Sequence, residues 1–457
     1  MDMHESFFDA LDHIDNFLWG YVGFPAIILA GLYFSIRSRF VQVRHFPEVC
    51  KIFLQFFFRK NVHAADPSSR GISPMSAFFA GLGGCVGIGN VVAIATAVQI
   101  GGPGAIFWMW ITAIIGSLLK YAEVFLGIRF RVHTKDNSFS GGPMYFLTRA
   151  FAPWAGSLFC VLMCIYGVEI FQFSVVTNSL SYNFDLDKTL VTAVLLVLVV
   201  LAEMGGMRRI ASICTAVIPL FIVLYLAMGA YVLISSASLI PQMFSDIFHA
   251  AFSPMAAVGS FVGSTLLVAI SQGMRRGCYS SDIGVGYASI IHSASRVKNP
   301  AQQAALVIFE VFLDTCVIST MSVLLVMVTG TWKEDILPIH LVQTSLSQFF
   351  PYMHYFMPFF LFLLGYTTVI TYFCAGAKTA EFVSPKYGRA AYYLYGVVSL
   401  FIFSFVETTE ALIVMSIVQV TLLALNLAGI LRLRKEISFD FTQTAPALTT
   451  TEAAGIG

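Results

Sequence analysis

Long apolar runs alternate with short polar and basic segments along the whole 457-residue chain. An α-helix rises about 1.5 Å per residue, so a run of about 20 apolar residues is long enough to cross a bilayer. The pattern predicts about eleven transmembrane helices and therefore an all-α integral membrane protein. The expected spans are 16–36, 73–100, 104–128, 152–180, 188–204, 210–236, 254–275, 302–329, 350–376, 389–406 and 409–432.

Composition supports this class of protein and excludes others. Hydrophobic residues make up 58% and charged residues 11% of the chain, and the mean hydropathy is +0.80, whereas soluble proteins carry about 25% charged residues. A net charge of +1 without a basic domain excludes a nucleic-acid-binding protein. The eight cysteines form no CxxC pair and are expected to be small buried residues. The acidic N-terminus has no Lys or Arg before Arg37, which predicts that no signal peptide is cleaved.

Basic residues fall almost entirely on one side of the predicted spans. With the N-terminus outside, all 26 Lys and Arg lie in cytoplasmic segments except Lys188, Lys333 and the intramembrane Lys120. The cytoplasmic group includes Arg275 and Arg276, at the end of the seventh predicted span. The positive-inside rule therefore predicts a multi-pass protein of the cell (inner) membrane with an outside N-terminus and a cytoplasmic C-terminus. The expected regions are an extracellular segment at 1–15, a transmembrane domain at 16–436 and a disordered cytoplasmic tail at 437–457.

A glycine-rich stretch, Gly81–Asn90, interrupts the second predicted span. Five of its ten residues are glycine, and each glycine costs about 1 kcal/mol relative to alanine inside a helix. We therefore expect the helix to break here. Backbone groups released by a break cannot stay unpaired in lipid, so they must face protein, water or a bound ligand. The break is thus a candidate binding site.

A second interruption is expected in the seventh predicted span, where residues 257–265 include Gly259 and Gly263. The two interrupted spans stand five spans apart and have opposite orientations, which is the pattern of an inverted repeat. Spans 2–6, at 73–236, and spans 7–11, at 254–432, would form its two halves, and the first span would be an addition. The alternative is that these small residues only allow helices to pack closely.

A broken helix offers ligands of two kinds. Its free N–H groups suit a carboxylate and its free carbonyl groups suit a cation, so one break fits a zwitterion that enters with a metal ion. Asn90 follows the break, and its side-chain oxygen either ligates a cation such as Na⁺ or caps the second half-helix. Thr367 and Thr368 lie mid-span, where their hydroxyls either bind a ligand or bond back to the preceding turn. Gln172 either lines a site or holds neighbouring helices together.

Three ionisable residues also lie within the predicted spans. Lys120 and Glu123 are three residues apart in the third span and are expected to neutralise each other as a structural pair. Asp314 in the eighth span is a proton-relay candidate, but a structural hydrogen bond to a neighbouring helix is the favoured role.

Several motifs together resemble the alanine/glycine:cation symporter family, the sodium:alanine symporters, over about Trp19 to Leu433. The most specific stretch runs from Gly87-Ile88-Gly89-Asn90 through Gly101-Gly102-Pro103-Gly104-Ala105-Ile106-Phe107-Trp108-Met109-Trp110 and is followed by Lys120-Tyr121-Ala122-Glu123-Val124. Further matches are Gly141-Gly142-Pro143-Met144-Tyr145, Gly205-Gly206-Met207-Arg208-Arg209-Ile210, Asp314-Thr315, and Thr367-Thr368 with Gly376. The resemblance implies a leucine-transporter-like fold, in which an inverted repeat of two five-helix halves carries two broken helices.

The resemblance also implies a binding site. The substrate carboxylate would meet backbone amides around Ile88 and Gly89, and the substrate amine would face the break of the seventh span. The residues implied in substrate binding are Cys85, Gly87, Ile88, Gly89, Gln172, Gly259, Phe261, Gly263 and Tyr372. The implied sodium site comprises the carbonyls of Gly83 and Val86, a carbonyl near Leu364 and the hydroxyls of Thr367 and Thr368, with Asn90 as a further candidate.

The chain departs from the family pattern at several of these positions. Cys85 and Ile88 stand where the family usually has threonines, and Tyr372 stands where it usually has a tryptophan that caps the pocket. The family's usual Asn-Glu-Ala-Gly reads Ser281-Asp282-Ile283-Gly284 here, and Ala377 replaces a glutamate. Because the sodium set is intact, these changes bear on substrate identity more than on fold or on the coupling ion.

The residues and the resemblance together predict a transporter and not an enzyme. We expect a symporter that imports a small neutral amino acid, alanine or glycine first, together with Na⁺ by alternating access, and that functions as a monomer in the lipid bilayer. The nearest alternative is a transporter of the same fold with another amino acid or with proton coupling. The distant alternative is an integral membrane enzyme, for which the sequence offers no nucleophile, acid–base pair or metal cluster.

Overall fold

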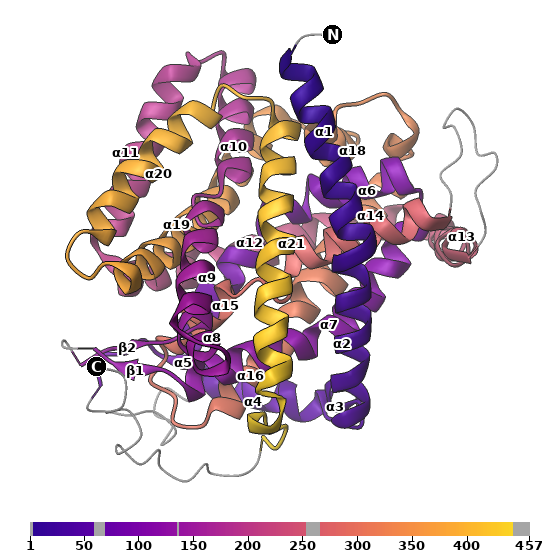
Figure 1. The fold of residues 1–457 in the computed structure, drawn as a ribbon. Helices are drawn as coiled ribbons and strands as arrows, with labels where there is room; N and C mark the ends of the chain where they lie inside the picture. Colours follow the sequence, from indigo (N-terminus) through magenta and orange to yellow (C-terminus); the bar gives the residue numbers. More distant parts are fainter. Residues whose placement is uncertain (1–2, 59–68, 135–136, 253–265, 442–457) are drawn as a thin grey trace.

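The chain is built almost entirely of helices (Figure 1). The structure is a computed structural model and describes residues 3–58, 69–134, 137–252 and 266–441. The first α-helices are α1 (Met3–Leu18), α2 (Phe24–Arg37), α3 (Val41–Arg44), α4 (Phe46–Phe58), α5 (Pro74–Cys85), α6 (Ala93–Gly101), α7 (Gly104–Arg129), α8 (Pro143–Ala150), α9 (Pro153–Tyr166), α10 (Ile170–Phe184), α11 (Lys188–Met204) and α12 (Gly206–Ser235). The later ones are α13 (Ile240–Phe252), α14 (Leu266–Ser281), α15 (Tyr287–Ser293), α16 (Pro300–Val311), α17 (Thr320–Val328), α18 (Leu341–Ser347), α19 (Met353–Val383), α20 (Gly388–Phe403) and α21 (Thr408–Arg432).

The remaining elements are short. Two are π-helical segments within longer helices, η1 (Trp19–Gly23) and η4 (Phe312–Ser319). Five are single 3₁₀ turns, namely η2 (Ile88–Asn90), η3 (Ala237–Leu239), η5 (Thr331–Lys333), η6 (Pro338–His340) and η7 (Arg434–Glu436). The strands β1 (Val132–His133) and β2 (Phe139–Ser140) pair antiparallel, with Val132 opposite Ser140 and His133 opposite Phe139.

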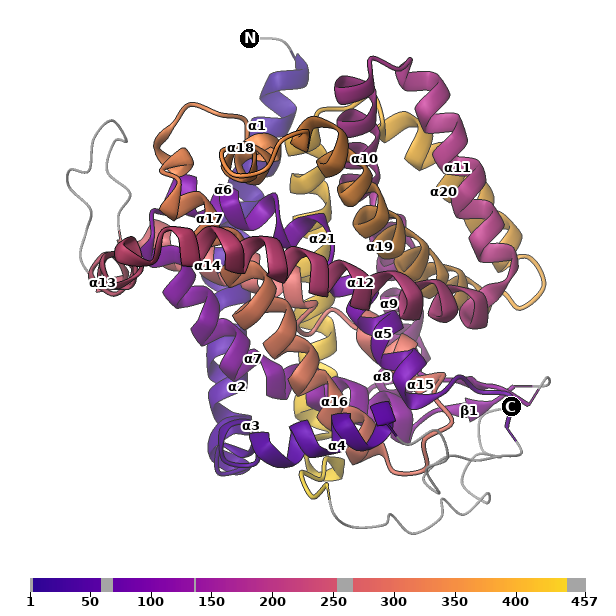
Figure 2. The same ribbon diagram turned by 180° about the vertical axis from the view of Figure 1, so that it is seen from behind.

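Two buried helices organise the packing. Helix α7 packs against α2, α14, α15 and α16, and helix α19 packs against α9, α10, α12 and α20. Helices α11 and α20 lie side by side at one edge of the molecule, as the view from behind also shows (Figure 2). Helix α5 packs against α15 and α16 of the first group and against α12 and α19 of the second. The C-terminal end of α5 therefore lies between the two groups.

The predicted all-α membrane class is confirmed, but the number of spans is not. Seven helices of the described residues are long and apolar enough to cross a bilayer, or eight if α5 and the helix after it count as one bent span. The bend between residues 74–85 and 88–101 is 55°. Helices also occupy the expected positions of the shorter spans at 188–204 and 389–406. The count of eleven stays a prediction.

The interpretation of Arg275 and Arg276 as the cytoplasmic end of the seventh span is wrong. Both are buried within α14, at 6% and 7% exposure, and Arg275 Nη1 lies 2.8 Å from Asp15 Oδ2 of the N-terminal helix. Asp15 was assigned to the extracellular segment, so the two assignments contradict each other. The positive-inside rule treats arginines as loop residues, whereas an arginine buried beside a carboxylate can stay inside a helix. The helix of Asp15 begins at Met3, well before the predicted residue 16.

The structure shows a break at 282–286, beyond the predicted end of the seventh span. Helix α14 continues to Ser281, and α15 begins only at Tyr287. Between them Asp282, Gly284 and Gly286 have φ values of 52°, 74° and 105°, in the left-handed region that glycine adopts most easily. The interruption expected at 257–265, with Gly259, Phe261 and Gly263, lies outside the described residues. Broken helices are thus present at α5–α6 and α14–α15, as the implied fold requires.

Several elements were not predicted from the hydropathy pattern. Helices α3, α4 and α13 lie in segments expected to be loops, because apolar and polar residues are too closely mixed there for a long apolar run. The start of the predicted tail also packs on the protein, since the ring centroid of Phe439 lies 5.2 Å from that of Tyr121 in α7. The rest of the tail, 442–457, lies outside the described residues.

Candidate functional site

The predicted interruption of the second span is present but begins later than its first glycine. Helix α5 continues to Cys85, and helix α6 starts at Ala93 after the single turn η2. The earlier glycines lie within α5. Glycine is required there because neighbouring side chains leave no room for a Cβ. A Cβ on Gly81 would lie 2.5 Å from His292 Nε2, and one on Gly84 would lie 2.2 Å from the Tyr287 hydroxyl. Glycine here serves close packing, and the break itself covers residues 86–92.

Backbone N–H groups at the break bond to two side chains. The Gly87 N–H donates to Asn90 Oδ1 and the Ile88 N–H donates to Gln172 Oε1, both at 2.9 Å. The break thus presents amides to carbonyl oxygens of amide side chains, the same geometry that a carboxylate oxygen would satisfy. Gln172 is brought to the predicted substrate residues, as expected.

The predicted sodium residues come together where α5 meets α19. Thr368 Oγ1 donates to the Gly83 carbonyl at 3.1 Å and to the Leu364 carbonyl at 3.2 Å. Thr367 Oγ1 donates to the Leu364 carbonyl at 2.8 Å. Both hydroxyls therefore make the back-bonds to the preceding turn that the sequence left as an alternative, and Thr368 also reaches the end of α5. Val86 caps α5 three residues after Gly83.

Gly87 joins the two sets. A Cβ built on Gly87 would lie 2.6 Å from Thr368 Oγ1 and 3.1 Å from both terminal atoms of Gln172. Thr368 belongs to the predicted sodium set and Gln172 to the predicted substrate set. Gly87 is therefore the point where the two meet, with no space for a larger residue.

Gly87→Ala is expected to lower substrate affinity about tenfold while the protein still folds, since the added methyl displaces Thr368 Oγ1 and Gln172. The matched control is Gly20→Ala, because a Cβ there meets no atom within 4 Å. Binding of a radiolabelled amino acid to the purified variants measures the effect. Equal affinity in Gly87→Ala and Gly20→Ala would show that the break is not part of the site.

Tyr372 lies between the two broken helices. Its hydroxyl donates to Asp282 Oδ1 at 2.9 Å, and its ring stacks on Tyr287 with centroids 4.0 Å apart. Asp282 Oδ2 accepts the Ala288 N–H at 3.1 Å. The tyrosine that replaces the family's tryptophan is thus fixed to the α14–α15 break, where a tryptophan would have no hydroxyl to donate.

Asn90 turns toward Asp314 and away from the Thr368 set. Its Nδ2 donates to Asp314 Oδ1 at 2.7 Å, to Ser280 Oγ at 2.9 Å and to Ser319 Oγ at 3.0 Å. Asp314 Oδ2 accepts from Ser280 and Ser281 at 2.8 and 2.7 Å. The favoured role of Asp314, a hydrogen bond to neighbouring helices, is therefore confirmed. Asn90 oxygen is occupied by the Gly87 N–H, so in this structure Asn90 acts as a cap.

The expected ion pair between Lys120 and Glu123 is wrong. Lys120 Nζ bonds Glu310 Oε1 at 2.8 Å, the Ser281 carbonyl at 2.8 Å and Cys85 Sγ at 3.0 Å. Glu123 instead accepts from the Ser289 N–H at 3.2 Å and from Asn426 Nδ2 at 3.0 Å. Spacing along one helix identified neighbours on α7, but the stronger partner comes from α16, which local spacing cannot show.

Glu310 connects this pair to the start of α5. Its second oxygen, Oε2, lies 3.1 Å from His292 Nε2, and Gln303 Nε2 lies 2.9 Å from His292 Nδ1 and donates to the Pro74 carbonyl at 3.2 Å. Lys120, Glu310 and His292 are all fully buried. Cys85, predicted in the substrate pocket, donates to Glu310 Oε1 at 3.2 Å and belongs to this buried network.

The sequence analysis missed several residues around the breaks. They are Glu169, Tyr166, Tyr279, Tyr287, His292 and Glu310. Glu169 and Glu310 carried a usable signal, because each is an acid inside an apolar run where a charge is costly. The tyrosines carried none, since aromatic residues occur in nine of the eleven predicted spans.

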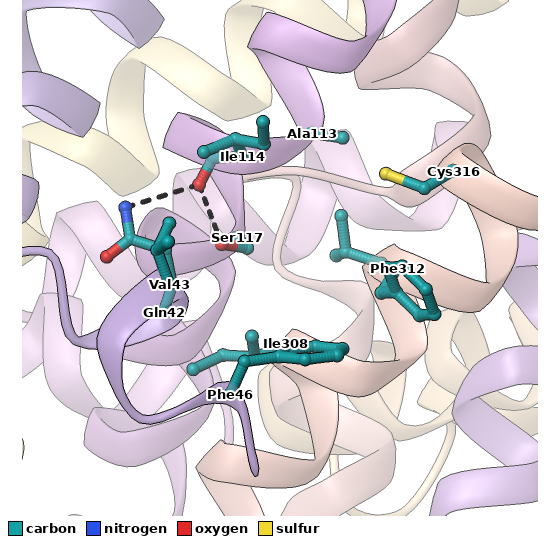
Figure 3. A pocket seen from close by; sticks show the side chains of 10 residues that line it. Gln42, Val43, Phe46, Ala113, Ile114, Ser117, Ile308, Phe312 and Cys316 are labelled. Carbon is teal, nitrogen blue, oxygen red and sulfur yellow. Dashed lines mark hydrogen bonds between the residues drawn. The ribbon is translucent and has the colours of Figure 1, made fainter. Parts of the chain in front are cut away.

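A cavity in the described residues lies elsewhere. It has a volume of about 240 Å³ and is bounded by α3, α4, α7, α16 and η4 (Figure 3). Figure 3 shows Phe312 and Cys316 on one wall and Ala113, Ile114 and Ser117 on another. None of its lining residues belongs to the sets around Gly87, and its wall is almost wholly apolar, so it does not fit a zwitterion.

Comparison with known proteins agrees with this architecture. A model of the sodium:alanine symporter family matches residues 4–444. An uncharacterized transporter of Haemophilus influenzae is 35% identical over 334 residues, 71% of this chain and 70% of that protein. The sodium/alanine symporter AgcS of Methanococcus maripaludis is 28% identical over 398 residues, 84% of this chain and 86% of that protein.

The fold is also found among solved structures. MhsT in complex with L-phenylalanine matches with a TM-score of 0.58 at 14% identity, over 79% of this chain and 89% of that one. At this identity the likeness concerns the fold, and it confirms the leucine-transporter-like architecture. Together with the family match, it establishes a transporter that crosses the membrane several times and is not an enzyme. The chain belongs to the sodium:alanine symporter family.

Proposed function

We propose that the protein is a sodium-coupled symporter that imports a small neutral amino acid, with alanine or glycine as the first candidate. The observation that carries the proposal is the meeting of two unlike ligand sets at one helix break. Gly87 lies against both Gln172, which accepts the Ile88 N–H, and Thr368, which donates to the Gly83 carbonyl. Free amides suit a carboxylate, and the carbonyls at a half-helix end suit a monovalent cation.

Gln172 marks the place of the substrate carboxylate. Its Oε1 accepts the Ile88 N–H, as a carboxylate oxygen would. A bound amino acid would replace Oε1 at Ile88 and accept the Gly89 N–H with its second oxygen. The Gln172 amide N–H groups would then donate to the carboxylate. Cys85 lies in the Glu310 network, so we leave it out of this substrate set.

Sodium would bind where the Gly83 carbonyl meets Thr368. The residues that would hold it are Gly83, Val86, Leu364, Thr367 and Thr368. In the structure the two hydroxyls bond to the Leu364 and Gly83 carbonyls, so an ion at this place would take over oxygens that now bond to each other. Bound Na⁺ would join the end of α5 to α19 and prepare the break for substrate.

The proposed coupling supplies enough energy for concentrative uptake. One Na⁺ and one zwitterion carry a single net charge, and moving it through 100 mV supplies about 2.3 kcal/mol. That energy corresponds to about fifty-fold accumulation before any sodium gradient is added. For import, we propose a cell-membrane location with the N-terminus outside and the C-terminus in the cytoplasm, which the remaining basic residues support without Arg275 and Arg276.

Purified protein in proteoliposomes tests the proposal. We expect L-alanine or glycine uptake with Na⁺ outside, a loss of at least tenfold when K⁺ replaces Na⁺, and stimulation by an inside-negative potential, because one net charge enters per cycle. Competition by other amino acids at fixed Na⁺, repeated at several pH values, identifies the preferred substrate. Undiminished uptake without Na⁺ would rule out sodium coupling, and uptake that follows a pH gradient instead would favour proton coupling.

A further inference from the structure

The fourth predicted span contains an interruption that the sequence analysis did not expect. Helix α9 ends at Tyr166 and helix α10 begins at Ile170. Glu169, the residue before α10, has φ of 53° and ψ of 50°, a left-handed conformation that is unfavourable for a residue with a side chain. Strain of this kind persists only where the surrounding structure holds it and is common at functional sites. The side chain of Glu169 makes no capping hydrogen bond to α10.

The Glu169 side chain is buried but incompletely bonded. Glu169 is 1% exposed, and its Oε2 has no hydrogen-bond partner. Its polar neighbours are Tyr279 and the backbone of Gln172. The hydroxyl groups of Tyr166 and Tyr279 are also buried and make no hydrogen bond of standard geometry; both lie near Glu169, and the Tyr279 hydroxyl also lies near the Gln172 side chain. Three unpartnered polar atoms therefore gather at one place.

Other buried acids near the breaks are bonded. Glu310 binds Lys120 and His292, and Asp314 accepts from Asn90 and two serines. Asp282 accepts from Tyr372 and from a backbone N–H. Nearly all buried polar groups in proteins have partners, so three such atoms at one place mark a candidate ligand site. Glu169 thus differs from its neighbours in the described part of the core.

These atoms lie beside the proposed carboxylate site. A Cβ built on Gly89 would lie 3.4 Å from Cε1 of Tyr279, so the Tyr279 ring covers Gly89. Gln172 lies one helical turn after Glu169, and its Oε1 accepts the Ile88 N–H. The Tyr166 ring meets Tyr372 edge-on, with centroids 5.5 Å apart. Glu169 and the two tyrosines therefore border the same break as the amides of Ile88 and Gly89.

We propose that Glu169, Tyr166 and Tyr279 bind the ammonium group of the transported amino acid. An ammonium group has three N–H donors and no acceptor, and the three unpartnered oxygens supply one acceptor each. A carboxylate is the strongest of these acceptors, because a bond between two charged groups is shorter and stronger than a neutral one. Arg276 is a buried cation that also lies near Tyr279, and Asp15 lies near it as a counter-charge. This assignment rests on the proposed function, since these residues would bind the ammonium end of the amino acid whose carboxylate binds at Ile88 and Gly89.

A buried carboxylate at this position also determines substrate class. Substrates with a free ammonium group would neutralise Glu169, whereas a 2-hydroxy acid of the same shape would leave its charge buried and unpaired. The site should therefore select L-alanine strongly over lactate. It should also exclude amino acids that place a second carboxylate near Glu169, because two like charges repel in a buried site.

Binding to the purified full-length protein tests this assignment. The probe is radiolabelled L-alanine in Na⁺, with unlabelled lactate as competitor. Glu169→Gln keeps the size of the side chain and removes its charge, and we expect at least about a tenfold rise in the Kd for alanine. The ratio of alanine affinity to lactate affinity should also fall at least about fivefold toward unity, since only alanine loses a charged partner. Tyr279→Phe should weaken alanine binding about threefold.

Glu203→Gln is the matched control, because Glu203 is also fully buried with unpartnered oxygens but lies on α11 beside Lys378 and Arg389. It should keep both the alanine Kd and the discrimination against lactate. Normal alanine affinity and discrimination in Glu169→Gln would overturn the assignment and leave the proposed function intact. An absence of sodium-dependent alanine binding in the wild-type protein would overturn both. An equal loss in Glu169→Gln and Glu203→Gln would assign Glu169 to the fold and overturn the assignment.

Discussion

Lys120→Met is expected to destabilise the fold by about 3–5 kcal/mol, the cost of removing one partner of a buried ion pair. Lys120 and Glu310 are fully buried and their charged atoms lie 2.8 Å apart. Without the ammonium group, Glu310 keeps only His292 and Cys85 as partners. The Ser281 carbonyl also loses its donor. Thermal unfolding of the purified protein in detergent should show a clear fall in Tm.

Two further variants separate charge loss from packing loss. Lys120→Met combined with Glu310→Gln removes both charges, so it should be more stable than Lys120→Met alone. Glu381→Gln breaks the pair with Arg389, which has an N–O distance of 3.2 Å and side chains 46% and 41% exposed. That surface pair should contribute at most about 1 kcal/mol. A Lys120→Met variant that melts at the wild-type temperature would show that the buried pair does not stabilise the fold.

Thr368→Val is expected to raise the Na⁺ concentration needed for half-maximal substrate binding about 100-fold or more. Replacing a residue that only orients a metal ligand already lowers metal affinity about 10–100-fold, and this change would remove a direct ligand. Valine keeps the shape of threonine but cannot bond to the Gly83 carbonyl, which Thr368 Oγ1 now contacts at 3.1 Å. Substrate binding titrated with Na⁺ measures the effect.

Thr371→Val, in the same helix, is the matched control for Thr368→Val. Thr371 is buried one turn further along α19, and its hydroxyl donates to the Thr367 and Thr368 carbonyls, at 2.8 and 2.9 Å. Its hydroxyl also lies near Tyr287 but near none of the proposed sodium ligands of α5, so its replacement should leave the Na⁺ dependence nearly unchanged. If Thr368→Val also leaves it unchanged while the protein stays folded, the ion does not bind at this threonine.

The overall class of fold could be predicted because it depends on local pattern. Apolar runs identified helices, and five glycines in ten residues identified the break of the second span. The predicted end of the seventh span is wrong, because Arg275 and Arg276 lie inside α14, which continues to Ser281. Their burial depends on Asp15, more than 250 residues earlier in the chain, and no local pattern contains that partner.

The residues of the candidate site also fall into those that a local pattern reveals and those that depend on partners far away in the chain. Thr367, Thr368, Gln172 and Gly87 were found because polar or small residues stand out inside apolar runs, and the structure brings them together. The pairing of Lys120 with Glu310 could not be predicted, since it depends on the packing of α7 against α16. The role of Cys85 changed for the same reason, because its partners come from both of those helices.

One ammonium group contacts the last residue of α5 and the last residue of α14, two helices that each precede a break. Lys120 Nζ bonds to Cys85, where α5 ends, and to the carbonyl of Ser281, where α14 ends. Two helix ends of this kind carry the same partial negative charge and would repel each other. A cation between the two ends attracts both and holds them together. Separating the ends would leave the buried Lys120 charge without partners in a medium that solvates it poorly. We therefore expect the ends of α5 and α14 to stay together during the transport cycle, and the larger displacements to occur in α6 and α15, which follow the two breaks.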